Sequence, residues 1–196
     1  MPDEIEIAAL KRHEACESSR LQILLKQLAV ESIRESIHVD SNTGFILDGA
    51  HRSQVCQTLG MQKIPVHFLS IQADASVPGW THSLEAKPTA LQVGGPQTGP
   101  IIAKYRQNGN LTYIRARSSS LQDVYDEFWA TAQAIDHYYP VRVEAPKNAE
   151  YSIEWQLPRW GQIVEIAQTH GVLPAGVSRM GSIFTARCQK CNLSVG

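Results

Sequence analysis

The sequence predicts a mixed α/β (α+β) protein built from two units. In the first half, a strand, a tight turn, a helix and a second strand follow one another over residues 45–69, which indicates a compact βαβ unit. In the second half, an Asn-Gly turn separates two strand-like runs, and a long helical pattern follows. The stretch between the halves is rich in proline and glycine. We therefore expect an N-terminal domain over residues 1–72, a linker or lid loop over 73–100 and a small α+β C-terminal domain over 101–196.

The first half is expected to alternate helices and strands. A serine can cap the first helix, and leucines recur along it at helical spacing. Turn-forming residues separate the first two strands, and Gly60 is suited to end the second helix. The expected elements are a helix from Ser18 or Ser19 to about Val30, strands over 36–39 and 45–47, a helix over 50–59 and a strand over 63–69.

The second half is expected to begin with a hairpin. Asn108-Gly109 between two strand-like runs is a strong local signal for such a turn. Pro158 is suited to the first turn of the last helix, and Gly171 to its end. The expected elements are strands over 101–106 and 111–117, a helix over 119–137, a strand over 139–143 and a helix over 158–170.

Composition excludes several classes of function. The chain has 196 residues, of which 43% are hydrophobic and 19% charged, as in a soluble globular protein. A net charge of −1 gives no overall attraction to nucleic acid or to an anionic membrane. No apolar run approaches the roughly 18 residues of a membrane span. The acidic N-terminal residues do not resemble a signal peptide, so we expect a cytoplasmic location.

The four cysteines are too sparse to indicate a disulfide scaffold. Cys188 and Cys191 have the spacing of a zinc knuckle, but no second Cys/His pair lies close by to complete four ligands. We interpret them as incidental.

The strongest functional signal lies where the strand over 45–47 turns into the following helix. Asp48-Gly49 makes the turn, and the first helical turn carries Ala50, His51 and Arg52. Such a turn presents free backbone N–H groups and the positive end of the helix dipole to an anion. Basic side chains oppose that dipole, so a bound phosphate best explains their position. An acid beside a phosphate can hold a metal ion or position a nucleophile.

Other candidate residues are weaker when taken alone. Glu17 lies near the expected start of the first helix, where the helix dipole explains an acid. Glu14 lies upstream of that helix beside His13, and it has no such explanation. Trp80 and the pair Ser178-Arg179 have useful hydrogen-bonding groups, but from the residue types alone they are only loop residues.

Taken together, these segments resemble the free L-serine kinases of the ParB/sulfiredoxin-like superfamily, which include the serine kinase of siderophore biosynthesis. Three motifs occur in the order of that family and span most of residues 11–190. They are His13-Glu14-x-x-Glu17-x-x-Arg20-Leu21, then Ile46-Leu47-Asp48-Gly49-Ala50-His51-Arg52 with Leu59-Gly60 and Lys63-Ile64-Pro65-Val66, and finally Pro174-Ala175-Gly176-Val177-Ser178-Arg179 with Arg187-Cys188. The resemblance implies a ParB/sulfiredoxin-like N-terminal domain.

The resemblance also implies an activity, namely phosphoryl transfer from ATP or ADP to the hydroxyl of free L-serine, giving O-phospho-L-serine. Magnesium would be held mainly by the phosphates, with Asp48 as the candidate protein ligand. The implied roles are a catalytic base for Glu14, a second essential acid for Asp48, phosphate binding for Gly49, Ala50, His51 and Arg52, cover over the serine for Trp80, and binding of its carboxylate for Ser178 and Arg179.

Ala50 argues against another activity that uses the same turn, the reductase activity of sulfiredoxin. Many members of the family have a histidine where Ala50 stands, although a small residue is tolerated there. Sulfiredoxin needs a cysteine directly before the His-Arg pair, and here that position is Ala50, while Cys56 lies two turns further along the helix. The sequence therefore argues against reductase chemistry.

A ParB-like nucleotide- and DNA-binding regulatory protein is the alternative from another functional class. Such a protein needs a basic helix-turn-helix region after its nucleotide unit. The near-neutral charge and the Asn108-Gly109 hairpin argue against that region. We expect small-molecule partners, a nucleotide and L-serine, and neither nucleic acid nor a membrane.

Overall fold

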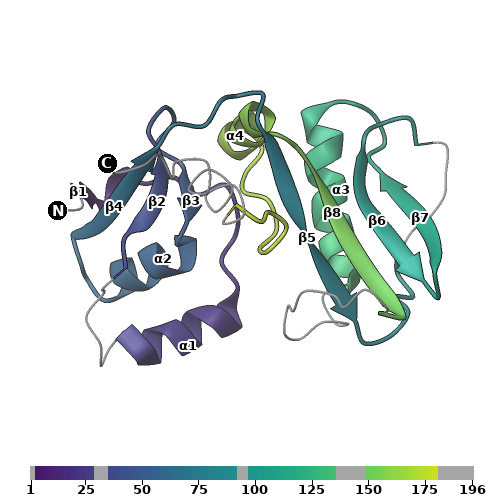
Figure 1. The fold of residues 1–196 in the computed structure, drawn as a ribbon, viewed down its shortest axis with the longest axis horizontal. Coiled ribbons are helices and arrows are strands. Elements are labelled where there is room, and N and C mark those ends of the chain that lie inside the picture. The colour runs from purple at the N-terminus through teal and green to yellow at the C-terminus, as the bar shows by residue number, and fades with distance from the viewer. Residues whose placement is uncertain (1–2, 29–34, 92–96, 136–148, 181–196) are drawn as a thin grey trace, which may run out of the picture.

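Over the residues that the structure describes, the fold is α+β with two four-stranded sheets (Figure 1). A computed structural model describes residues 3–28, 35–91, 97–135 and 149–180. The first sheet has the order β1-β4-β2-β3, in which β2 and β4 run parallel and the other neighbours antiparallel. Its strands are β1 (Asp3–Glu6), β4 (Lys63–Leu69), β2 (Ile37–Asp40) and β3 (Ile46–Asp48).

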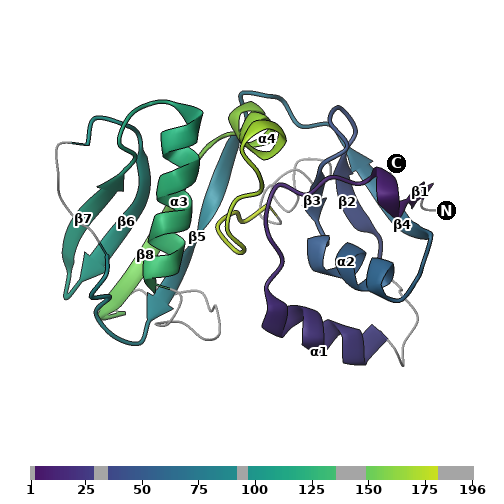
Figure 2. The ribbon, with the colours of Figure 1, turned by 180° about the vertical axis from the view of Figure 1, so that it is seen from behind.

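Two helices and a short 3-10 helix accompany this sheet. The 3-10 helix η1 (Ile7–Ala9) follows β1 directly. Helix α2 (Ala50–Thr58) connects β3 to β4, and α1 (Ser18–Leu28) packs beside α2 (Figures 1 and 2). Gly60 follows α2 with a φ of +77°, which agrees with its predicted role at the end of this helix.

The second sheet is antiparallel, with the order β5-β8-β6-β7. Helix α3 (Leu121–Ile135) lies along one face of it, and α4 (Trp160–Thr169) lies between the two sheets (Figures 1 and 2). The predicted Asn-Gly turn is present, with Asn108 and Gly109 both at positive φ. The strands are β5 (Ser76–Leu84), β8 (Tyr151–Arg159), β6 (Ile101–Gln107) and β7 (Asn110–Arg115).

The core is continuous between the two sheets. Phe45 and Leu47 belong to a large buried cluster that also holds Trp155 of β8 and Ile163 of α4. Ile46, between them, belongs instead to a smaller cluster inside the first sheet. Because side chains alternate along a strand, this short run is buried on both faces. That explains why it lacks the polar alternation of a half-exposed strand.

A buried carboxylate also joins the two halves. Asp40, at the end of β2, is fully buried. Its Oδ2 accepts hydrogen bonds from Thr43 Oγ1 (2.6 Å) and from Nε1 of Trp160 at the start of α4 (3.0 Å). Its Oδ1 accepts the backbone N–H of Ile71 (3.2 Å). These bonds hold α4 against the first sheet.

The structure corrects the expectation that residues 73–100 form a linker or loop throughout, because residues 76–84 form β5. The pairing of β5 with β8 is irregular on both sides of Pro78. Proline is tolerated there because β5 is an edge strand. A Cβ at Gly79 would overlap the carbonyl of Trp155, so glycine allows β8 to approach closely. The proline and glycine therefore mark a bulged edge strand.

Other expectations differ at element boundaries. Pro158 lies in β8, since pairing with β5 continues as far as Arg159, and the last helix starts only at Trp160. Strand β1 was not expected, because its four residues, of which three are exposed, carry no periodic signal. The strand expected over 139–143, the end of the first helix at Val30, and Cys188 and Cys191 lie outside the described residues. None of the helices in the described part of the chain is long and apolar enough to cross a lipid bilayer.

Candidate functional site

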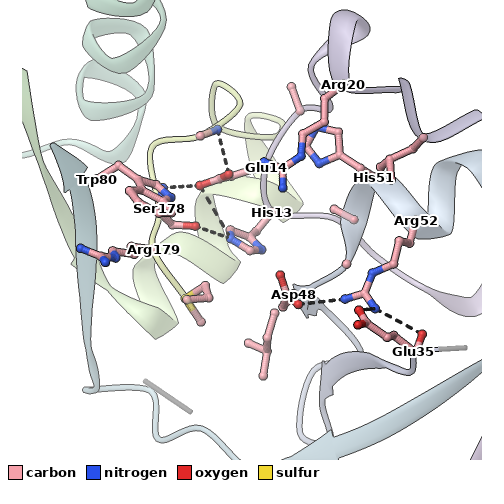
Figure 3. Close-up of a pocket in the computed structure, with 17 residues that line it drawn as sticks. His13, Glu14, Arg20, Glu35, Asp48, His51, Arg52, Trp80, Ser178 and Arg179 are labelled. Carbon is pink, nitrogen blue, oxygen red and sulfur yellow. Dashed lines mark hydrogen bonds and ion pairs between the residues drawn. The ribbon is translucent and has the colours of Figure 1, made fainter. Parts of the chain in front are cut away.

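A cavity of about 960 Å³ is lined by residues of both halves of the chain. One side comes from β3, the start of α2, α1 with the segment before it and the residue Glu35 before β2. The other side comes from β5 and the segment after α4. Figure 3 shows how these side chains converge. All the residues that the sequence suggested line it, namely Glu14, Asp48, Gly49, Ala50, His51, Arg52, Trp80, Ser178 and Arg179.

The start of α2 forms one wall. Gly49 is the N-cap of α2, with a φ of +96°, and as a glycine it has no side chain with which to cap the helix. A Cβ at Gly49 would overlap Cγ2 of Ile37, and the positive φ disfavours any other residue as well. The first-turn N–H groups of α2 thus begin at the cavity wall, where the helix dipole favours an anion.

Arg52 already has partners in this structure. Its guanidinium contacts the carboxylates of Asp48 (3.0 Å) and Glu35 (3.2 Å). It also donates to the backbone carbonyls of Glu35 (3.2 Å) and Ser36 (3.3 Å). The side chain is 19% exposed, so these contacts orient it against the cavity wall.

His51 has a different contact from the one expected of a phosphate ligand. Its Nε2 accepts the backbone N–H of Glu17 at 2.9 Å, so the ring proton is on Nδ1. The imidazole therefore attaches the segment before α1 to the start of α2. Arg20 of α1, an exposed cation for which the sequence suggested no role, lines the cavity next to His51 (Figure 3).

Asp48 ends β3 and is half exposed, at 50%. One of its carboxylate oxygens contacts Arg52, and the same oxygen lies 3.9 Å from Nδ1 of His38 on the paired strand. Burial lowers the pKa of His38, and Asp48 opposes this shift only in part. Asp48 thus faces the cavity with its negative charge partly balanced.

Glu14 joins the two halves at the cavity. It lies in an extended segment that pairs with residue 173, through hydrogen bonds from Ala15 N–H to Leu173 O and from Leu173 N–H to His13 O, both 2.8 Å. Its carboxylate accepts the backbone N–H of Gly176 (3.1 Å) and that of Ser178. Each oxygen therefore has a fixed position and a remaining lone pair.

His13 is buried beside Glu14, with its residue only 5% exposed. Its Nδ1 lies 2.9 Å from the carbonyl of Ile46, and its Nε2 lies 3.0 Å from Oγ of Ser178. Burial lowers the pKa of His13 more than the nearby Glu14 carboxylate raises it. The ring is thus neutral at neutral pH.

The part of the cavity wall formed by Trp80 and Arg179 is aromatic and cationic. The guanidinium carbon of Arg179 lies 4.6 Å from the ring centre of Trp80. Trp80 in turn stacks on His82, with ring centres 6.0 Å apart. The backbone N–H of Trp80 donates to Val177 O (3.1 Å), and the backbone N–H of Arg179 donates to Pro78 O (2.8 Å). The bulged strand β5 therefore positions both residues.

Three titratable side chains that line the cavity received no role from the sequence. His13 and Arg20 lie within the first motif, so their positions were marked but not their contacts. Glu35 carries no sequence signal, because only the fold brings it to Arg52. Within the described ranges, no group of three or more His, Cys, Asp or Glu side chains is arranged to hold a metal ion.

Solved structures share this fold. A mutant free serine kinase in complex with ADP matches with a TM-score of 0.71 at 16% identity, covering 91% of this chain and 86% of that chain. A free serine kinase in complex with AMP matches with a TM-score of 0.66 at 17% identity, over 91% and 86%. SbnI from Staphylococcus aureus, truncated at its C-terminus, matches with a TM-score of 0.68 at 17% identity, over 90% and 81%.

No protein-family model matches the sequence, and neither does any curated protein. At these identities the structural likeness concerns the fold. The resemblance to free serine kinases that the motifs indicated is confirmed at that level.

Proposed function

We propose that this protein is a kinase that transfers a phosphoryl group from ATP or ADP to the hydroxyl of free L-serine, giving O-phospho-L-serine. The observation that carries the proposal is the convergence of Glu14, Asp48 and Arg179 on one cavity beside the start of α2. The fold supports it, because it resembles those of a free serine kinase in complex with AMP and of a mutant free serine kinase in complex with ADP.

The terminal phosphates of the nucleotide would lie at the start of α2. The backbone N–H groups of Gly49 and Ala50 and the helix dipole favour an anion there. Arg52, with its fork of donors, would contact a phosphate from the cavity wall. Arg20 would add a second positive charge from α1.

Glu14 would act as the general base. The proton of the serine hydroxyl passes to the Glu14 carboxylate while the hydroxyl oxygen forms a bond to the terminal phosphorus. The bond from that phosphorus to the bridging oxygen breaks, and the nucleotide leaves with one phosphoryl group fewer. The two backbone N–H groups that hold Glu14 fix the direction of its free lone pairs. Positioning of this kind supplies much of the rate in phosphoryl transfer.

The chemistry of the cavity fits a magnesium ion bound with the nucleotide. Mg²⁺ is usually held by one or two carboxylates together with phosphate oxygens and water, and the half-exposed Asp48 would be its protein ligand. When bound, the ion neutralises charge on the phosphates. If Asp48 does not hold the ion, its role would be to orient the reacting groups through its contact with Arg52.

The acceptor amino acid would lie between Glu14 and Trp80. The indole would cover its short side chain, and Arg179, held over that indole, would attract its carboxylate. Free serine is small, so one aromatic wall and one cation can define most of its position.

Mass spectrometry of reaction products tests the proposal. The protein is incubated with Mg²⁺, with ATP or ADP, and with L-serine, L-threonine or L-homoserine in turn. We expect phosphoserine to form faster than the other phosphorylated amino acids, with release of ADP or AMP. Glu14→Ala prepared in the same way excludes a contaminating kinase. Absence of any phosphorylated amino acid with either nucleotide would refute the proposal.

A further inference from the structure

The hydroxyl of Ser178 has a fixed direction, set by a buried histidine. Ser178 is 8% exposed and lines the cavity, and its Oγ lies 3.0 Å from Nε2 of His13. The other ring nitrogen of His13 lies 2.9 Å from the carbonyl of Ile46. Figure 3 shows Ser178 next to Glu14 and Trp80, with its hydrogen bond to His13 drawn as a dashed line.

The proton positions follow from these contacts. A carbonyl oxygen can only accept, so Nδ1 of His13 must carry a proton. The ring is buried and neutral, which leaves Nε2 as an acceptor. The only proton that can lie between Nε2 and Oγ is therefore that of the Ser178 hydroxyl, which donates to His13.

Both donors of Ser178 are consequently in use, because its backbone N–H donates to Glu14. What Ser178 offers the cavity is the lone pairs of Oγ, beside the negative charge of Glu14. This end of the cavity accepts hydrogen bonds and favours a cation.

We infer that Ser178 and Glu14 bind the ammonium group of the amino-acid acceptor, with His13 as the residue that orients Ser178. This rests on the proposed function and moves Ser178 from the acceptor's carboxylate, where the sequence resemblance placed it, to the ammonium group. It also gives Glu14 a second role: Oε1, which accepts the Ser178 N–H, faces the ammonium group, and Oε2, which accepts the Gly176 N–H, remains for the hydroxyl proton. The carboxylate then lies toward Arg179, at the other end of the acceptor. The cavity selects hydroxylated acceptors that carry a protonated amine.

The carboxylate role for Ser178 would require its hydroxyl to turn away from His13. Nε2 of His13 would then lose the hydrogen bond in a buried site. An unsatisfied buried polar atom is costly, and a carboxylate beside Glu14 would add charge repulsion. Binding of an ammonium group needs neither change.

The test compares three acceptors in steady-state kinetics with the wild-type protein and Ser178→Ala. L-Serine carries both charged groups, ethanolamine lacks the carboxylate, and 3-hydroxypropionate lacks the amine. Analogues that are not phosphorylated are measured as competitive inhibitors against L-serine. We expect Ser178→Ala to raise the KM or inhibition constant of L-serine and of ethanolamine by about ten-fold or more, as for the loss of a hydrogen bond to a charged group. The KM or inhibition constant of 3-hydroxypropionate should stay within about two-fold of its wild-type value, because this acceptor has no ammonium group to bond with Ser178.

Two further variants make the comparison specific. Ser152→Ala removes a buried serine of β8 outside the cavity and should leave all three constants unchanged. Ser178→Cys keeps a weak donor toward His13 but offers a poor acceptor, so it repeats the test if alanine disturbs the segment. An equal loss for all three acceptors, or a loss restricted to 3-hydroxypropionate, would overturn the inference. No transfer to L-serine by the wild-type protein would instead refute the proposed function.

Discussion

Glu14 has two contacts that any substitution must disturb, because its carboxylate holds the backbone of Gly176 and Ser178. For Glu14→Ala we expect phosphoserine formation to fall by at least about 100-fold, the lower range for loss of a general base. Nucleotide affinity should change little, since the start of α2 does not depend on this residue. Turnover and ADP affinity are measured in parallel.

The matched control is Glu165→Ala, which removes an exposed carboxylate of α4 outside the cavity. It should leave turnover unchanged. If Glu14→Ala retains full turnover, Glu14 is not the base. If it loses nucleotide binding to the same extent as turnover, its main role is to hold the segment around residue 176.

Arg52 is the residue on which nucleotide affinity should depend most. Arg52→Ala removes a forked donor and leaves Asp48 and Glu35 without their cation, so repulsion from phosphate increases. We expect ADP affinity to fall by about ten-fold or more, as for the loss of one charge-assisted hydrogen bond. Calorimetric titration with ADP and Mg²⁺ measures it. The control is Arg106→Ala, which removes an exposed cation of β6 outside the cavity. If both substitutions weaken ADP binding equally, the loss comes from the change in net charge and not from a contact of Arg52 with a phosphate.

The buried His13 predicts how stability depends on pH. Its pKa in the folded protein lies below the value of about 6.5 in an unfolded chain, because burial disfavours the charged ring. The unfolded state thus binds more protons between these two pKa values, and stability falls as the pH falls from about 6.5 toward the folded pKa. His38 shifts in the same direction.

We therefore expect the urea midpoint to be nearly constant above the ordinary histidine pKa and to decrease on acidification below it. Urea unfolding at a series of pH values measures this, and His13→Gln should show a shallower decrease. A midpoint that rises on acidification through this range would contradict the prediction.

Among the elements, α2 depends most on one glycine. Gly49→Ala forces a side chain into positive φ and against Ile37, which should cost about 2–4 kcal/mol of unfolding free energy. Gly60→Ala imposes a comparable φ, +77°, with no atom within 4 Å of the new Cβ, so only about 1–2 kcal/mol is expected.

The same pair of variants tests the anion site. Gly49→Ala should also weaken ADP binding, since it displaces the start of α2, whereas Gly60→Ala at the other end should not. Urea unfolding and ADP titration of the two variants provide the comparison. If Gly49→Ala and Gly60→Ala lose the same unfolding free energy, contact of the new Cβ with Ile37 adds nothing to the cost at Gly49.

Sequence patterns predicted those helices, strands and turns that are specified by residues close together in the sequence. The strand over 63–69, the helix after Gly49 and the Asn108-Gly109 hairpin depend on residues within a few positions of one another. Strand β5 was missed because Pro78 and Gly79 resemble loop residues. Only its edge position and the close approach of Trp155 make them compatible with a strand.

At the scale of the whole molecule, the hydrogen bond from Trp160 Nε1 to the Asp40 carboxylate should contribute strongly to stability, because it joins the two halves of the chain. Trp160→Phe leaves a fully buried carboxylate with one donor fewer, so we expect a loss of about 2–3 kcal/mol. Trp129→Phe is the control, because Nε1 of Trp129 donates to a neutral carbonyl, that of Val172, and should cost only about 1 kcal/mol. Thermal and urea unfolding measure both. Equal losses would mean that the charge of Asp40 is not decisive.

The sequence by itself determined which residue types are available for chemistry and the local elements that carry them. Asp48-Gly49 before a helix indicates an anion site wherever it occurs, because the turn and the dipole are local. The tertiary structure decided what those groups do. His13 and Ser178 are 165 positions apart, and no local pattern predicts that one fixes the hydroxyl proton of the other. The direction of a hydrogen bond depends on every partner of both groups, and folding alone brings those partners together.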